Sequence, residues 1–163
     1  AGVEAPGMRE AVDDAVAFVR RTGDHGGFRY QPLGVGNNSI RNAIGALVGL
    51  LYGLEGPSVG TAFDEIDRHL FAATQVDDAD DYAMYYAYYA TRACFLRGGP
   101  GWETWRSVMI RQLLRIQERD GSWPAFQDER DAGPRYATAL AVMILRLCLD
   151  EAPRYLKKEV RGF

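Results

Sequence analysis

Apolar residues recur at the spacing of an α-helix in six segments of the chain, which clusters of Gly, Pro and Asp separate. The pattern predicts an all-α protein with helices at about residues 6–21, 40–54, 81–97, 102–118 and 135–149, and another that starts at Ser58. Ser39 is a candidate N-cap for the second helix. Residues 23–38 contain five glycines and one proline, and we therefore predict a long loop there.

The helix predicted at 81–97 carries aromatic or apolar side chains on nearly every side, which is typical of a buried, inner helix. Core packing alone would explain a face made of Tyr82, Tyr86 and Tyr89. So many hydroxyl groups nevertheless need partners or a wet cavity, because an unsatisfied buried donor costs about 1 to 3 kcal/mol. We therefore expect a concave aromatic surface that binds a ligand or a peptide.

The first and last parts of the chain align without a gap at an offset of 95 positions. The aligned pairs are Phe18 with Leu113, Gly26 with Gly121, Phe28 with Trp123, Leu47 with Val142, Leu50 with Leu145, and Leu54 with Leu149. A middle unit has the same order of outer helix, loop and inner helix. We predict a single α-α repeat domain over residues 1–163, with hairpins at about 1–54, 57–97 and 100–150 that stack on one another.

A motif lies between the helices predicted at 102–118 and 135–149. The apolar helix end at 113–116 is followed by Gln117, a short polar gap and Gly121-Ser122-Trp123. This stretch resembles the QW motif of the terpenoid cyclase and protein prenyltransferase superfamily. We expect the Gln amide to satisfy backbone groups at the helix end, while the aromatic ring stacks beside it and fixes the turn.

Three other stretches carry the same resemblance. Residues 26–30 look like a degenerate copy of the motif, with Phe28 in place of Trp. The segments 81–86 and 136–141 are similar to the inner helices of bacterial prenyltransferase and squalene-oxidase repeat proteins.

The resemblance implies an α/α toroid, in which inner and outer helices alternate around a central cavity. The three hairpins of this chain are fewer than the superfamily uses to close a ring. The chain is then part of a longer protein, or two copies complete a ring, or the ring stays open. Because a partial toroid exposes apolar edges, we predict a homodimer or a part of a bigger chain.

An acidic motif precedes the inner helix at 81–97. Asp78, Asp80 and Asp81 form the sequence DADD, which matches the DxDD motif of class II terpene cyclases. The resemblance implies that Asp80 is a Brønsted acid, with neighbouring carboxylates and burial raising its pKa, and that Asp78 and Asp81 orient it. Aromatic ring faces would then stabilise carbocations. The alternative is structural, because acidic residues also cap a helix N-terminus and complement its dipole.

The ligand-binding residues expected from these arguments are all aromatic. They are Tyr82, Tyr85, Tyr86, Tyr89, Trp123 and Tyr136.

Composition and charge exclude several classes of function. The chain has 163 residues, of which 47% are hydrophobic and 25% charged, as in globular proteins. Its net charge of −3 argues against nucleic-acid binding, which requires a basic face. Its longest apolar run, 137–149, is broken by Arg146 and is shorter than the roughly 18 residues of a membrane span.

Metal and cofactor chemistry is not indicated. Cys94 and Cys148 lie in apolar runs without a zinc-type spacing and are expected to be buried free thiols. No cofactor and no metal is predicted. The sequence therefore favours a module that binds an isoprenoid-like or other apolar ligand, or a peptide, and the alternative is a cyclase-like enzyme that uses Asp80.

Overall fold

The computed structural model describes residues 5–33, 39–72, 83–126 and 130–149. They form six α-helices and one small antiparallel sheet, which confirms the all-α prediction. The elements are α1 (Met8–Thr22), β1 (Gly23–Asp24), β2 (Gly27–Phe28), α2 (Ser39–Tyr52), α3 (Pro57–Ala72), α4 (Ala83–Arg97), α5 (Gly99–Ile116) and α6 (Gly133–Leu149).

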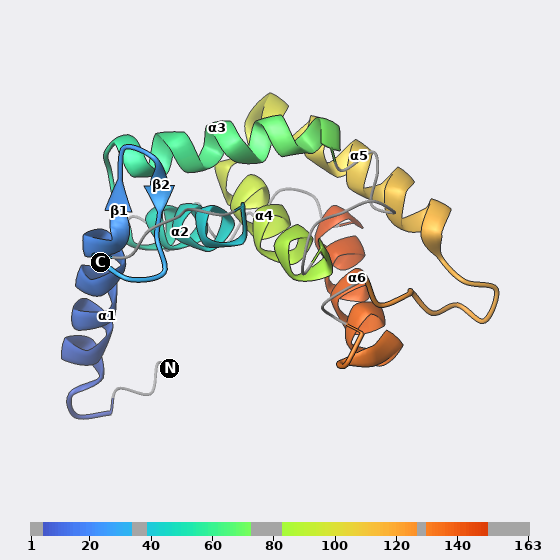
Figure 1. The fold of residues 1–163 in the computed structure, drawn as a ribbon, viewed down its shortest axis with the longest axis horizontal. Helices are drawn as coiled ribbons and strands as arrows, with labels where there is room; N and C mark the ends of the chain where they lie inside the picture. Colours follow the sequence, from blue (N-terminus) through green and yellow to red (C-terminus); the bar gives the residue numbers. More distant parts are fainter. Residues whose placement is uncertain (1–4, 34–38, 73–82, 127–129, 150–163) are drawn as a thin grey trace.

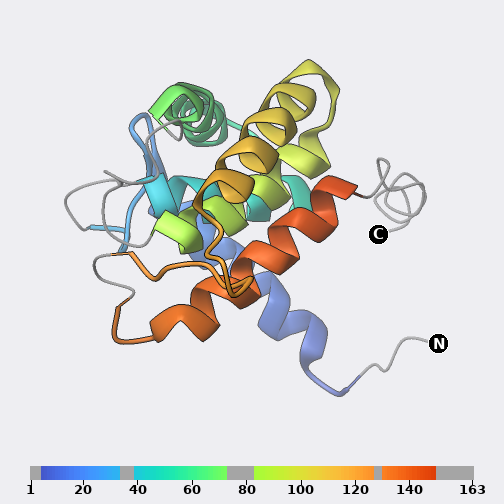
Figure 2. The same cartoon turned by 90° about the vertical axis from the view of Figure 1, so that its right-hand side faces the viewer.

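Three of the helices form an inner row, in which α2 packs against α4 and α4 packs against α6. On the outer side, α3 packs against α2, and α5 packs against α4 and α6. Figure 1 shows the result as an arch, with α3 and α5 along its outer side and α1 and α6 at its two ends. The view in Figure 2 shows α5 and α6 running side by side at one end.

The predicted loop at 23–38 contains β1 and β2, which the sequence analysis did not predict. Gly23 pairs with Phe28, and Asp24 pairs with Gly27. The hairpin lies against α3, where the Thr61 hydroxyl donates a hydrogen bond of 3.0 Å to the carbonyl of His25. Strands of two residues are too short to show the alternation that identifies a strand in a sequence.

Phe28 joins this hairpin to α2. Its side chain is buried, and its backbone N–H donates a hydrogen bond of 2.7 Å to Oδ1 of Asn42, which is fully buried in α2. The Asn42 amide in turn donates to the carboxylate of Glu65 on α3. The Phe28 ring lies over Gly45, where an added Cβ atom would stand 2.1 Å from the ring. The hairpin, α2 and α3 are therefore fixed to one another around a single buried amide.

The loop between α5 and α6 makes matching contacts. Trp123 is also buried, and its backbone N–H donates a hydrogen bond of 3.0 Å to the hydroxyl of Thr138 on α6. Its indole N–H donates a hydrogen bond of 2.8 Å to the carbonyl of Leu113, one of the last four carbonyls of α5, which have no intrahelical partner. The Gln117 amide instead donates to the carbonyl of Gly121 across the turn, at 3.0 Å. The indole thus caps the helix, a role that we expected of the Gln amide, and Gln117 braces the turn.

Candidate functional site

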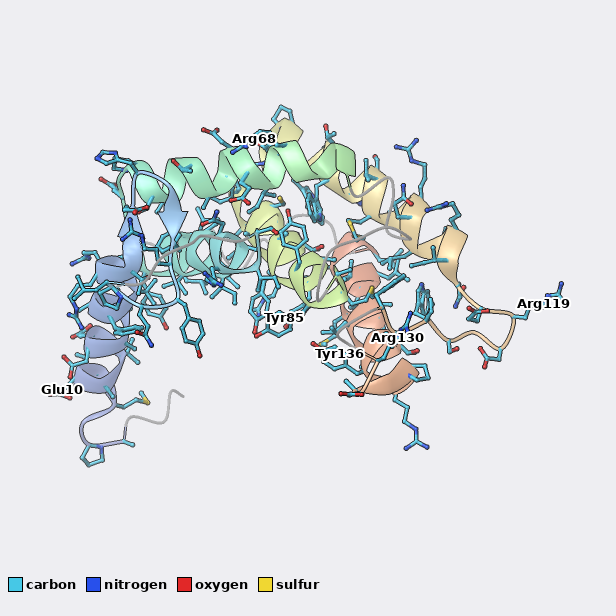
Figure 3. All side chains as sticks on the ribbon, viewed as in Figure 1. Glu10, Arg68, Tyr85, Arg119, Arg130 and Tyr136 are labelled. Atoms are coloured by element: carbon cyan, nitrogen blue, oxygen red, sulfur yellow. The ribbon has the colours of Figure 1, made fainter. Side chains whose placement is uncertain are left out.

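One face of α4 carries three tyrosines and an arginine, at spacings that bring them together on a helix. We call this set, Tyr85, Tyr88, Tyr89 and Arg92, the tyrosine face. All four side chains are half-buried. Figure 3 shows Tyr85 below α4, on the concave underside of the arch.

The remaining sides of α4 explain why it is an inner helix. Small side chains there are buried, which lets neighbouring helices approach closely: Ala87, Ala90, Thr91, Ala93 and Cys94. The hydroxyl of Thr91 accepts a hydrogen bond of 2.9 Å from the indole of Trp105 on α5. With its other sides packed, α4 leaves the tyrosine face as its partly open side.

The rings of the tyrosine face contact one another edge to face. The Tyr89 ring centroid lies 4.8 Å from that of Tyr85 and 5.2 Å from that of Tyr88. Arg92 donates a hydrogen bond of 3.1 Å to the Tyr88 hydroxyl, and its guanidinium carbon lies 5.6 Å from the centre of that ring. These contacts hold three aromatic rings and one cation in a continuous surface.

Two hydroxyl groups of this surface, those of Tyr85 and Tyr89, are linked by a hydrogen bond. A side-chain hydrogen bond with Tyr85, together with burial, raises the pKa of Tyr89 from 10.0 to about 12. The hydrogen bond and burial thus favour the neutral phenol of Tyr89, whose hydroxyl lies beside the apolar rings of the face.

Tyr86, which we expected to contact a ligand, lies against Trp105 on α5. Its ring meets Trp105 edge to face, with centroids 6.2 Å apart, and it packs against the hydrophobic core. Burial raises the pKa of Tyr86 strongly, and nearby Cys94, Glu65 and Asp67 add to the effect. Tyr86 therefore belongs to the contact between α4 and the outer layer.

Two further aromatic residues expected at the site, Trp123 and Tyr136, lie near the α6 end of the arch. Trp123 is 4% exposed and uses both of its N–H groups within the fold. Tyr136 is half-buried in the first turn of α6. Figure 3 shows Tyr136 on the underside of the arch, as it does Tyr85. Of the two, Tyr136 is the one with surface left to contact a ligand.

The proposed acid and its neighbours lie outside the described residues. These are Asp78, Asp80, Asp81 and Tyr82. Along the chain they directly precede α4, which begins at Ala83.

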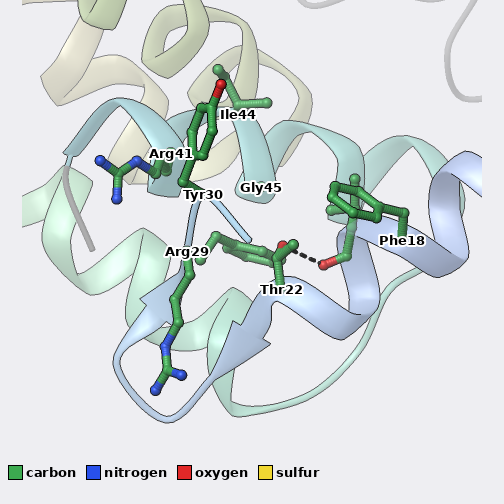
Figure 4. Close-up of a pocket in the computed structure, with 9 residues that line it drawn as sticks. Phe18, Thr22, Arg29, Tyr30, Arg41, Ile44 and Gly45 are labelled. Atoms are coloured by element: carbon green, nitrogen blue, oxygen red, sulfur yellow. Dashed lines mark hydrogen bonds between the residues drawn. The ribbon is translucent and has the colours of Figure 1, made fainter. Parts of the chain in front are cut away.

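A shallow apolar hollow, which was not expected from the sequence, lies at the opposite end of the arch (Figure 4). We call it the α1–α2 hollow. It has a volume of about 140 Å³. Its lining comes from α1, from α2 and from the residues around β2, and includes Phe18, Val19, Phe28, Tyr30, Arg41, Ile44 and Gly45. Phe18 and Tyr30 remain 45% and 75% exposed. The signal in the sequence was the pair of aromatic residues, but nothing in their spacing showed that a helix and a loop bring them together.

No group of three or more His, Cys, Asp or Glu side chains in the described ranges is arranged to hold a metal ion. None of the helices that the structure describes is both long and apolar enough to cross a membrane. Cys94 and Cys148 are free and buried, as expected.

The chain was compared with family models, curated proteins and solved structures. No family model, no curated protein and no solved structure matches the chain.

Proposed function

We propose that the chain is a helical-repeat module that binds an isoprenoid-like or other apolar ligand on the tyrosine face of α4. The observation that carries the proposal is the contact among three half-buried tyrosine rings on the inner row of helices. Aromatic rings provide a large rigid apolar area, while their hydroxyls stay at the wet boundary. A peptide with apolar side chains is the alternative ligand for the same surface.

A partial toroid of the terpenoid cyclase and prenyltransferase type is part of this proposal. The inner row formed by α2, α4 and α6, with α3 and α5 outside it, supports such an arrangement. The two loops with a buried aromatic residue and a side-chain acceptor on the next inner helix support it as well. We would also expect a toroid of this kind to self-associate through its free ends.

A titration tests the binding proposal. Farnesol is added to the protein in a calorimeter, and the titration is repeated with Tyr89→Ala and with Tyr52→Ala, a control tyrosine that is 51% exposed on α2. We expect Tyr89→Ala to weaken binding by about tenfold or more, equivalent to about 1.4 kcal/mol, and Tyr52→Ala to leave the affinity unchanged. Equal affinities for all three proteins, or no binding by the unmodified chain, would count against the proposal.

Cyclase-like chemistry is the second candidate, favoured by the DADD sequence that directly precedes α4. Asp80 would protonate an alkene or epoxide, and the tyrosine rings would stabilise the cation that forms. Incubation with squalene and with geranylgeranyl diphosphate, followed by mass spectrometry, tests this activity. A cyclised product that disappears in Asp80→Asn supports it, and unchanged substrate with the parent protein argues against it.

A further inference from the structure

The three helices of the inner row carry positive charge and no negative charge. Within their bounds, α2, α4 and α6 contain no aspartate and no glutamate. Their charged residues are all arginines, namely Arg41, Arg92, Arg97, Arg135 and Arg146. The outer helices α3 and α5 contain both signs, and their acidic residues are Asp64, Glu65, Asp67 and Glu103. The inner row therefore favours an anionic ligand, although the chain as a whole has a net charge of −3.

Two arginines of α4 differ in what they contact. Arg97 makes two hydrogen bonds to the Asp67 carboxylate on α3, at 2.6 and 3.0 Å. Arg92, which belongs to the tyrosine face, is half-buried and donates to an uncharged group, the Tyr88 hydroxyl. It forms no ion pair with any of the described residues. Because burial removes part of the hydration of a charged group, a half-buried arginine without a carboxylate is a favourable position for a bound anion.

The orientation of the Arg92 guanidinium leaves donors for such an anion. Its hydrogen bond to Tyr88, at 3.1 Å, uses Nη1, and the described part of the chain offers no second acceptor. A guanidinium has five N–H groups, and the edge formed by Nε and Nη2 fits the two oxygens of one carboxylate. The Tyr88 ring, whose centre lies 5.6 Å from the guanidinium carbon, holds this edge on the tyrosine face.

The charge of Arg92 also acts on the centre of the face. The hydrogen bond with Tyr85 and burial raise the pKa of Tyr89, whereas the positive charge of Arg92 lowers it. The same charge favours the ionised form of an acid bound beside these rings.

We propose that the ligand of the tyrosine face is a monocarboxylic acid with an apolar chain, whose carboxylate binds Arg92 and whose chain lies on the tyrosine rings. This inference rests on the proposed function, to which it adds the charge and the orientation of the ligand. A single guanidinium offsets a single negative charge, as a carboxylate carries. Tyr85 lies two turns before Arg92, about 10 Å along the axis of α4, which leaves room for an apolar chain beside the head group.

Two ligands with the same chain, farnesoic acid and farnesol, test the inference in a calorimeter at neutral pH. The acid is ionised there and the alcohol is neutral. We expect the parent chain to bind the acid about tenfold more tightly than the alcohol, because a charge-assisted pair with Arg92 forms only with the acid. Acetate, which has the head group without the chain, should not bind at the same concentrations.

Variants on the two sides of the arch locate the carboxylate. Arg92→Gln should lower the affinity for the acid about tenfold and that for farnesol less, so that the two affinities agree within about twofold. Arg92→Lys should retain part of the preference, because it keeps the charge but loses the planar fork. Arg68→Gln is the matched control, since it removes the same charge from the outer helix α3, where Arg68 is exposed (Figure 3). Circular dichroism checks that each variant is folded.

Three outcomes would overturn the inference, and they separate it from the proposed function. Equal affinities of the parent chain for the acid and the alcohol would remove the role of charge and leave the proposed function standing. A preference for the acid that persists in Arg92→Gln would show that the carboxylate binds elsewhere. No binding of either ligand would overturn the proposed function, and this inference with it.

Discussion

Tyr85 and Tyr89, one turn apart on α4, share a side-chain hydrogen bond, and their rings meet edge to face with centroids 4.8 Å apart. The pair combines the two properties that the proposed site needs, namely an apolar surface and a neutral hydroxyl. Because each ring restrains the other, the surface is in place before a ligand arrives.

The first prediction concerns the ionisation of Tyr89, whose pKa is raised from 10.0 to about 12, chiefly by the hydrogen bond with Tyr85. Tyr85→Phe removes that bond and should lower the pKa of Tyr89 toward 10.0. The shift is measured by NMR on protein with carbon-labelled tyrosine. Tyr88→Phe is the control, because Tyr88 raises the pKa of Tyr89 less than Tyr85 does. A pKa for Tyr89 that is the same with and without the Tyr85 hydroxyl would contradict this assignment.

The same shift predicts a dependence of stability on pH. Since the pKa of Tyr89 is higher in the folded chain than its ordinary value of 10.0, its contribution is fully present below pH 10 and is lost as the pH rises toward about 12. Urea titrations across this range should show a steeper fall in the free energy of unfolding for the parent chain than for Tyr85→Phe. Parallel curves would show that the hydrogen bond does not favour the neutral phenol.

The second prediction concerns the indole cap of α5. Trp123→Phe keeps a buried ring but leaves the Leu113 carbonyl without its hydrogen bond, and it should reduce the free energy of unfolding by about 1 to 3 kcal/mol. Gln117→Ala removes only an exposed hydrogen bond and should cost less than about 0.5 kcal/mol. Urea unfolding measures both. A larger loss for Gln117→Ala than for Trp123→Phe would reverse the roles assigned to the two side chains.

The third prediction concerns two glycines in helices. An alanine at Gly45 places its Cβ atom 2.1 Å from the Phe28 ring, and overpacking of this kind costs about 1 to 3 kcal/mol. An alanine at Gly60 meets nothing within 4 Å and should stabilise α3 by about 0.5 to 1 kcal/mol. The melting temperature should therefore fall for Gly45→Ala and rise for Gly60→Ala. Equal and small changes would mean that the Phe28 ring does not lie against α2.

The fourth prediction concerns the two thiols. Burial raises the pKa of Cys94 to about 12 and that of Cys148 to about 11, from 9.0. Both should react slowly with a thiol reagent at neutral pH in the native protein, and rapidly after unfolding in guanidinium chloride. Rapid labelling of either cysteine in the native state would indicate that the core around α4 and α6 is open.

The helices themselves could be predicted from the sequence because their apolar stripes are long and regular. The predicted helix ends were less accurate where a proline or glycine determines the boundary. The pattern predicted a start at Trp102, but α5 begins at Gly99, because Pro100 fits the first turn of a helix, where no N–H partner is needed. The strands β1 and β2 could not be predicted, since two-residue strands carry no periodicity.

The candidate site was predicted only in part. The tyrosines of the helix at 81–97 indicated an aromatic surface, but the sequence did not show that Tyr86 turns toward Trp105 while Tyr85 and Tyr89 stay partly open. That division depends on which neighbours α4 meets on each side. The role of Trp123 as a helix cap depends likewise on a contact with the Leu113 carbonyl ten residues away, and the motif had led us to assign that role to the Gln117 amide.

The measurement that tests the central proposal most directly is a farnesol titration of the chain with carbon-labelled tyrosine, followed by NMR. The account predicts that the ring signals of Tyr85, Tyr88 and Tyr89 shift together and saturate with a single dissociation constant. The signals of Tyr30 and Tyr52, which are 75% and 51% exposed and lie on other elements, should not move. Uniform small shifts of all tyrosines, or shifts confined to Tyr30 and Tyr52, would contradict a ligand site on the tyrosine face.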